Sequence, residues 1–280
     1  MSDRIAYRYI DSHAHLDFPD FDKDRDALMK DIFNSGCVAV VNPGANIATS
    51  HAAIELAKKY DRVYPAVGIH PHEAIQYLGA GNDAMDMLYR DIETLDKLAS
   101  MPEVVAIGEC GLDYYRFDKT NAATSKIIAL QKELFQLQLT IAQKRGKPII
   151  LHVRDAYEDV LEVLDIQEYS SKGVAHCYEG SWPVTEVLLS RGFSLGFTAN
   201  ITYAKKESIH EVIKKVSLER ILLETDSPYL PPQGRRGKRN DSRSVIDVGK
   251  KIAELHATPE EEVFRQTTNN TTTLFSLPVL

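Results

Sequence analysis

The chain has 280 residues, 44% of them apolar and 26% charged, which is enough apolar material for a large buried core. Its 33 lysines and arginines against 40 aspartates and glutamates give a formal net charge of −7, which argues against a protein that coats duplex DNA through a broad basic face. Three dispersed cysteines exclude a disulfide framework or a thiolate zinc cluster. With no apolar signal-peptide stretch at the start and no run long enough to span a bilayer, we expect a cytoplasmic protein.

Short aliphatic and β-branched runs alternate with helical patterns along the chain. The runs predict strands at 7–10, 38–41, 63–69, 104–107, 148–151, 173–175, 193–197 and 221–223. Continuous apolar runs of this kind are typical of parallel strands buried on both faces. Helices are predicted at 25–34, 49–60, 85–99, 157–164, 183–190 and 208–216. A further helix, which ends at Gly146, is indicated by an apolar stripe of Ile127, Leu130, Leu134, Leu137 and Ile141.

Eight strand–helix units predict an α/β fold, a (β/α)8 TIM barrel, with extra C-terminal helices near 245–255 and 259–275. An open, doubly wound sheet is the structural alternative. No low-complexity linker or break in composition divides the chain, so we expect a single domain over residues 1–280.

Histidines and acidic residues gather at the C-terminal ends of the predicted strands. In chain order they are His13 and His15, His70 and His72, Glu109, His152, His176 and Asp226. All strands of a (β/α)8 barrel run the same way, so their C-terminal ends share one rim, where catalytic groups meet despite large separations in sequence. The intervals between these residues correspond to about one or two strand–helix units, so the sequence predicts one shared site.

The residue types at these positions predict a metal site. Neutral imidazoles and carboxylates suit divalent ions such as Zn²⁺ or Mn²⁺, with Mg²⁺ as a further candidate. Four histidines and two carboxylates exceed what one catalytic zinc needs, so we predict two divalent metal ions with Glu109 as the carboxylate between them. The predicted ligands are His13, His15, Glu109, His152, His176 and Asp226. His70 and His72 are explained equally well as direct ligands, as support for the ligands or as phosphate contacts.

Six short segments share an order known from one protein family. They read DSHAHL at 11–16, GIHPH at 68–72, GECGLDY at 108–114, HVR at 152–154, HCYEG at 176–180 and ETDSPYL at 224–230. From Asp11 to Phe275 the chain thereby resembles the TatD family of metal-dependent deoxyribonucleases, which belongs to the amidohydrolase-like metal barrels. The chain differs after Asn240, where Asp241-Ser242 replaces an acidic residue and proline, which concerns the loop after the last strand and not the ligands.

The resemblance implies that the six predicted ligands hold the metals. It also implies hydrolysis of DNA phosphodiester bonds, commonly as a 3′-to-5′ exonuclease on single strands. In such a hydrolase acting on ester bonds, two metals activate a water molecule. Asp226 would position that water as ligand and general base, so Glu109 and Asp226 are the predicted catalytic residues.

Cations and aromatic rings near the same rim suggest substrate contacts. Arg154 is predicted to contact a phosphate, with a structural ion pair as the alternative. The run from Arg235 to Arg239 holds four cations, and Arg236 and Lys238 are the predicted phosphate contacts. We also expect Asp113 to orient a neighbouring loop or ligand and Glu224 to support a ligand. Tyrosines that could stack on bases, or pack at the rim, are Tyr114, Tyr115, Tyr178 and Tyr229.

Two other functions remain open at this point. A barrel amidohydrolase or lactonase would direct the same activated water at a carbonyl, so the ligands alone discriminate poorly. Arg154 and the basic run favour a phosphate substrate. A non-catalytic metal or nucleic-acid binder would bind DNA without turnover, but an open set of His and carboxylate ligands is a poor purely structural site. We expect a single strand or strand end of DNA as the substrate, no membrane association and no stable protein partner.

Overall fold

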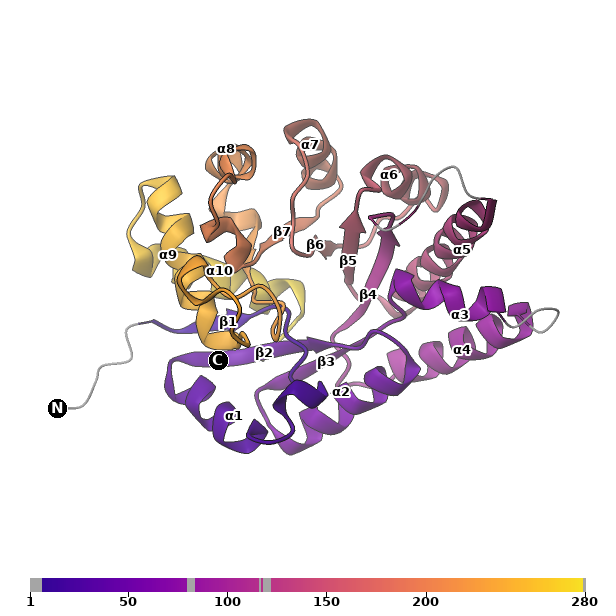
Figure 1. Ribbon diagram of the computed structural model, residues 1–280, viewed down its shortest axis with the longest axis horizontal. Coiled ribbons are helices and arrows are strands. Elements are labelled where there is room, and N and C mark those ends of the chain that lie inside the picture. Colours follow the sequence, from indigo (N-terminus) through magenta and orange to yellow (C-terminus); the bar gives the residue numbers. More distant parts are fainter. Residues whose placement is uncertain (1–6, 80–83, 116, 118–121, 279–280) are drawn as a thin grey trace.

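Eight parallel strands pair in sequence order in the computed structural model, which describes residues 7–79, 84–115, 117 and 122–278. Each strand is hydrogen-bonded to the next one along the chain, and the helices surround the strands (Figure 1). The strands are β1 (Tyr9–Asp11), β2 (Cys37–Pro43), β3 (Val63–Val67), β4 (Ala106–Asp113), β5 (Ile149–Arg154), β6 (Gly173–Ala175), β7 (Ser194–Phe197) and β8 (Ile221–Leu223).

The first and last strands meet at their C-terminal ends and close the barrel there. The Ser12 amide donates to the Leu223 carbonyl at 3.0 Å, and the Asp226 amide donates to the His13 carbonyl at 2.9 Å. A parallel bridge joins Ala14 to Ser227 just beyond these bonds. The predicted (β/α)8 barrel is therefore confirmed, and the open-sheet alternative is wrong because an open sheet does not join its two outermost strands.

Helices follow the strands as the sequence predicted, with one addition. The six-residue helix α3 (Ala74–Gly79) was not predicted. The others are α1 (Arg25–Asn34), α2 (Ile47–Lys59), α4 (Ala84–Ala99), α5 (Ala122–Arg145), α6 (Tyr157–Ile166), α7 (Trp182–Ser190), α8 (Glu207–Lys215), α9 (Val245–His256) and α10 (Glu260–Leu274). The last two are the predicted C-terminal helices. Within the described ranges, no helix is long and apolar enough to cross a membrane.

The interior of the barrel is a small apolar core that the C-terminal segment closes from one end. Alternate strand residues point to the same face, so seven strands contribute side chains: Ile10, Ala39, Val41, Ala66, Ala106, Ile150, Val174 and Leu222. Leu274, Phe275 and Leu277 pack against this cluster. The Asn270 side-chain amide donates to the Leu218 and Ile221 carbonyls at 2.6 and 2.9 Å, at the start of β8. The polar site is therefore left to the opposite, C-terminal end of the strands.

Strand β4 is longer than the predicted strand at 104–107, and it carries Glu109 inside it rather than after it. Two glycines, which are poor strand formers, hide the extension in the sequence. The register against β5 shifts, because Ile107 pairs with Ile149 but Cys110 already pairs with Leu151. Such irregularities next to active sites redirect a side chain. Glu109 lies within this one.

Two buried glutamines of α5 hold the backbone of two segments at the rim. The side chain of Gln138 accepts from the Ile69 amide at 2.7 Å and donates to the Ile69 carbonyl at 2.9 Å. Gln131 makes the same pair of bonds with Asp113, at 3.0 and 3.2 Å. Strand β3 therefore stops at Val67 rather than at residue 69, because the backbone groups of Ile69 bond α5. The apolar stripe that predicted this helix faces the core: Leu134 and Ile141 are buried, and Leu130 and Leu137 are partly buried against it.

Candidate metal centre

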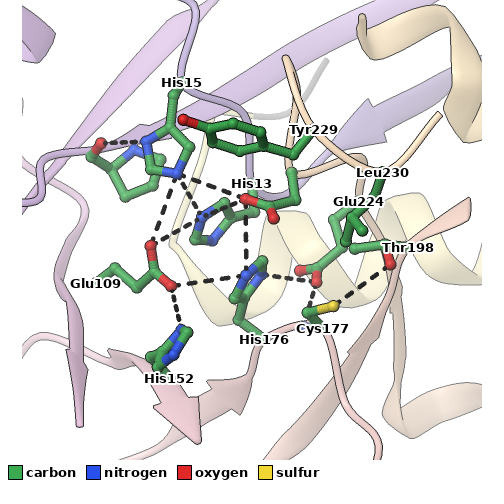
Figure 2. A network of polar contacts seen from close by, with 12 residues as sticks. His13, His15, Glu109, His152, His176, Cys177, Thr198, Glu224, Tyr229 and Leu230 are labelled. Carbon is green, nitrogen blue, oxygen red and sulfur yellow. Dashed lines mark hydrogen bonds and ion pairs between the residues drawn. The ribbon is translucent and has the colours of Figure 1, made fainter. Parts of the chain in front are cut away.

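The six predicted metal-binding residues converge at the C-terminal end of the barrel (Figure 2). Each comes from a strand or from the loop directly after one. Three groups of donor atoms, each with all members within 4.8 Å of one another, could hold a metal ion. These groups are His13, Glu109 and His176; His13, His15 and Asp226; and His70, Glu109 and His152.

Glu109 is the residue that the cluster shares, and its two oxygens face different rings. Its Oε2 atom lies 3.4 Å from Nε2 of His13 and 3.6 Å from Nε2 of His15. Its Oε1 atom lies 2.6 Å from Nδ1 of His152 and 3.7 Å from Nε2 of His176. This is the arrangement expected of a carboxylate between two cations.

Asp226 completes the cluster from the side of β8. Its Oδ1 atom lies 3.7, 3.6 and 3.8 Å from the Nε2 atoms of His13, His15 and His176. The residue has a left-handed backbone with φ of 56°, a conformation that aspartate adopts more readily than most residues and that is common at functional sites. The side chains of Asp226 and His152 are each 18% exposed, whereas the other four are almost fully buried, so solvent reaches the cluster beside these two.

A protein acceptor contacts the outward nitrogen of three of the four rings. His15 Nδ1 lies 3.2 Å from the Pro43 carbonyl, and His176 Nδ1 lies 2.8 Å from Oε1 of Glu224. His152 is held through its other nitrogen, Nε2, which lies 3.2 Å from Oδ2 of Asp113. Such contacts fix the orientation of metal-binding rings. Asp113 and Glu224 thus contact the histidines, as expected of supporting residues.

Glu224 is fully buried and occupies a space that a glycine keeps open. Its carboxylate accepts from the Cys177 amide at 2.6 Å, in addition to its contact with His176. A Cβ atom at Gly196 would overlap the Glu224 carboxylate. Position 196 on the neighbouring strand β7 therefore needs a residue without a side chain.

The buried charges shift the pKa values of several carboxylates and histidines in the cluster. Burial by itself raises the pKa of Glu109, but His13, His70 and His176 outweigh it and hold that pKa well below its usual range. Burial lowers the pKa of His176, yet Glu224 and Glu109 raise it overall to about 10. Likewise Asp113 and Glu109 overcome burial and raise the pKa of His152 to about 9. The ionised carboxylates thus attract positive charge to this end of the barrel, which is the electrostatic requirement for binding cations.

The two histidines after β3 differ in their positions. His70 is mostly buried, with Nε2 3.7 Å from Oε1 of Glu109, and burial beside His152 lowers its pKa to about 3. His72 is 54% exposed and its Nε2 lies 2.9 Å from Oδ2 of Asp113. His70 therefore lies against the cluster itself, while His72 lies farther out and contacts Asp113 and the ring of His70.

The basic residues at the rim divide into paired and unpaired side chains. Arg235 pairs with Asp247 at 2.6 Å, and Arg239 makes two hydrogen bonds to Asp24 at 2.9 and 2.5 Å. The Arg236 guanidinium instead lies 4.8 Å from the centre of the Tyr203 ring, and Lys238 is exposed. Arg154 is also exposed and lies 3.5 Å from the centre of the Tyr115 ring, and it has no ion pair with any residue that the structure describes.

The chain as a whole is similar to known proteins. The family model described as TatD related DNase matches residues 10–276. The chain belongs to the TatD family. It is 35% identical over 269 residues to the uncharacterised metal-dependent hydrolase YabD of Bacillus subtilis, covering 96% of this chain and 99% of the relative. The TatD-family chain is therefore a metal-dependent hydrolase.

Two further relatives span the same length. The chain is 33% identical over 274 residues to the 3′-5′ ssDNA/RNA exonuclease TatD of Salmonella typhimurium, covering 96% of this chain and 99% of that one. The crystal structure of YjjV, a TatD homologue from Escherichia coli, superposes with a TM-score of 0.84 at 30% identity, over 97% of this chain and 99% of that chain. The TatD-family barrel thus accounts for nearly the whole chain.

Proposed function

We propose that the chain is a metal-dependent deoxyribonuclease that cleaves DNA phosphodiester bonds as a 3′-to-5′ exonuclease on single strands. The observation that carries the proposal is the position of Glu109, whose two oxygens face separate groups of imidazoles. The exposed Arg154 ends the same strand that carries His152. The 3′-5′ ssDNA/RNA exonuclease among the relatives supports the choice of substrate.

The donor set fits two divalent ions, with Zn²⁺, Mn²⁺ and Mg²⁺ as candidates. His13, His15 and Asp226 would hold one ion, and Glu109 would serve both. His152 and His176 would hold the other, because both face Oε1 of Glu109. The fit rests on imidazole nitrogens and carboxylate oxygens that lie within 4.8 Å of one another in each group, while three of the four rings contact a protein acceptor through another nitrogen. When bound, such ions lower the pKa of a water molecule towards neutrality and neutralise charge on a phosphate.

The remaining chemistry comes from side chains of this protein. Asp226, the more exposed of the two carboxylates, would orient the attacking water and accept its proton. Arg154 would bind a phosphate oxygen from the rim of β5, because its guanidinium is exposed and has no carboxylate within ion-pair distance among the described residues. Arg236 and Lys238 would contact the strand farther from the cleavage point.

The net charge of −7 is compatible with this function. Divalent ions, when bound, would neutralise the carboxylates at the metal centre, so the formal charge would overstate the negative potential at the rim. A cationic mouth in an otherwise acidic surface admits a strand end and binds duplex DNA weakly. The charge thus excludes one mode of DNA binding and not the substrate.

The test compares nucleic acids with small carbonyl compounds. Single-stranded DNA labelled at the 3′ or the 5′ end, duplex DNA, RNA, and a panel of cyclic amides and lactones are incubated with the chain and with Mg²⁺, Mn²⁺ or Zn²⁺. We expect stepwise shortening of single-stranded DNA from its 3′ end. The Glu109→Ala variant, purified identically, controls for contaminating nucleases. Cleavage of the amide and lactone panel without cleavage of DNA would overturn the proposal in favour of an amidohydrolase or lactonase.

A further inference from the structure

Two tyrosine rings are exposed at the end of the barrel that carries the metal centre. Tyr115 is 56% exposed and Tyr229 is 55% exposed. The other two candidate tyrosines, Tyr114 and Tyr178, are buried, with hydroxyls bonded to Asp159 and Thr185, so for these two the packing alternative holds and not base stacking. The remaining large apolar side chains that are exposed in the described part of the chain belong to helices: Ile75, Tyr89 and Ile166.

The order of the strands places these two rings on opposite sides of the mouth. Tyr115 follows β4 and Tyr229 follows β8. In a closed barrel whose strands are arranged from β1 to β8, the fourth and eighth strands lie across from each other. The metal centre, with ligands from both strands, therefore lies between the rings. Figure 2 shows Tyr229 on the side of the cluster where His15 lies.

The backbone amide of each exposed tyrosine is hydrogen-bonded to a residue of the metal centre or to a residue that contacts it. The Tyr115 amide donates to Oδ1 of Asp113 at 3.0 Å, and the other oxygen of Asp113 contacts His152. The Tyr229 amide donates to the carbonyl of Asp226 at 2.9 Å. The Asn240 side chain further holds the Tyr229 carbonyl at 2.7 Å. The backbones of both exposed residues are thus fixed relative to the metal centre.

The surroundings of the rings suit a nucleotide on each side. The Arg154 guanidinium covers one face of Tyr115, which leaves the other face for a flat ligand and places a cation beside it. Tyr229 meets Phe18 edge-on with ring centres 6.4 Å apart, and Phe18 stacks on His15 at 4.6 Å. An aromatic surface thereby continues from a predicted ligand outwards to the exposed ring.

We propose that Tyr115 and Tyr229 are stacking platforms for unpaired nucleobases on either side of the phosphate that is cleaved. This inference rests on the proposed nuclease function. Base stacking on tyrosine tolerates any sequence but requires a base that is not paired, because a paired base is covered by its neighbours in the duplex. The two rings would therefore select single strands, and they would contribute little to the hydrolysis of a phosphodiester without a nucleobase.

The test uses two substrates with the same leaving group, thymidine 5′-(p-nitrophenyl phosphate) and methyl p-nitrophenyl phosphate. For each protein the ratio of kcat/KM for the thymidine ester to that for the methyl ester is measured with saturating Mg²⁺ or Mn²⁺. Tyr115→Leu and Tyr229→Leu remove the ring, whereas Tyr115→Phe and Tyr229→Phe keep it. Tyr89→Leu is the matched control, because Tyr89 is 49% exposed on α4.

We expect at least one of the two leucine variants to lower the ratio about tenfold, since the thymidine ester carries one base, while the phenylalanine variants and Tyr89→Leu retain it. With a single-stranded oligonucleotide, both leucine variants should then raise KM. An unchanged ratio in both leucine variants, while the wild type cleaves DNA, would overturn the stacking role alone. An equal loss in the phenylalanine variants would assign the effect to the hydroxyls and overturn it too. Absence of phosphodiester cleavage by the wild type would instead refute the proposed function and with it this inference.

Discussion

The two ends of the barrel are built from opposite kinds of side chain. At the C-terminal end, histidines and carboxylates face one another at distances of 2.6 to 3.8 Å. At the N-terminal end, Leu274, Phe275 and Leu277 fill the opening with apolar atoms. The first arrangement accumulates charge that a cation must balance, and the second buries apolar surface from water. We therefore expect substitutions at the C-terminal end to change activity without unfolding the protein. Substitutions at the N-terminal end should lower stability without changing the chemistry.

The largest effect on activity is expected from Glu109→Ala. Removing the carboxylate shared by both groups of imidazoles should lower kcat for single-stranded DNA by at least about a thousandfold, because it weakens the sites for both cations. Far-ultraviolet circular dichroism should show a folded protein. The exposed Glu211→Ala serves as a control and should retain activity. Activity that survives in Glu109→Ala with added Mg²⁺ or Mn²⁺ would refute the bridging role.

The opposite end is tested by Phe275→Ala, which should lower the free energy of unfolding by about 3–5 kcal/mol. The aromatic ring packs in the barrel interior, far along the strands from the metal centre, so kcat should stay unchanged at temperatures where the variant is folded. Chemical denaturation and steady-state kinetics measure the two quantities. The exposed Ile75→Ala is the control, with an effect of about 0.5 kcal/mol or less. A loss of kcat in the folded variant would show that the two ends are coupled.

A smaller effect should follow Glu224→Gln, which keeps the size of the side chain but removes the charge beside His176. We expect metal affinity to fall about 10–100-fold, as is typical when a residue supporting a metal ligand is changed. Most of the activity should return at saturating metal. Isothermal titration with Mn²⁺ measures the affinity, and Gly196→Ala should act in the same direction by displacing the Glu224 carboxylate. Unchanged metal affinity in both variants would refute the role of Glu224 in supporting the metal ligand His176.

The smallest effect is expected at the basic loop. The double variant Arg236→Ala/Lys238→Ala should raise KM for single-stranded DNA about two- to tenfold and reduce the salt dependence of binding by about 1.4 in the log–log slope, because two phosphate contacts are lost. Arg235→Ala is the control, since Arg235 already pairs with Asp247 at 2.6 Å. A larger rise in KM for Arg235→Ala would reverse the assignment within this loop.

The barrel was predictable because buried parallel strands leave continuous apolar runs, and helix α1 matches its predicted bounds at 25–34. Only the start of strand β4 was predicted from the sequence, because Gly108 and Gly111 carry no side chain that indicates a strand. The short helix α3 was missed for a different reason, since six residues hold too little periodicity to recognise. The side chains that converge were predictable from their positions after strands.

Partners distant in sequence were not predictable. Arg239 is neutralised by Asp24, which lies 215 residues away, whereas Arg236 in the same run is not. Likewise no local pattern shows that Tyr114 is buried and its neighbour Tyr115 exposed. The glutamines of α5 could have been found, because residues 131, 134 and 138 share one helix face and Leu134 belongs to the predicted apolar stripe.

Those two glutamines give α5 a constraint on its length. Seven residues separate Gln131 from Gln138, which corresponds to about 10 Å along a helix and nearly two full turns. One residue inserted between them would rotate one glutamine by about 100° relative to the other, so that only one of Asp113 and Ile69 could keep its paired bonds. Insertions before Gln131 or after Gln138 leave this spacing intact. This part of α5 therefore tolerates substitutions on its outer face but neither insertions nor deletions.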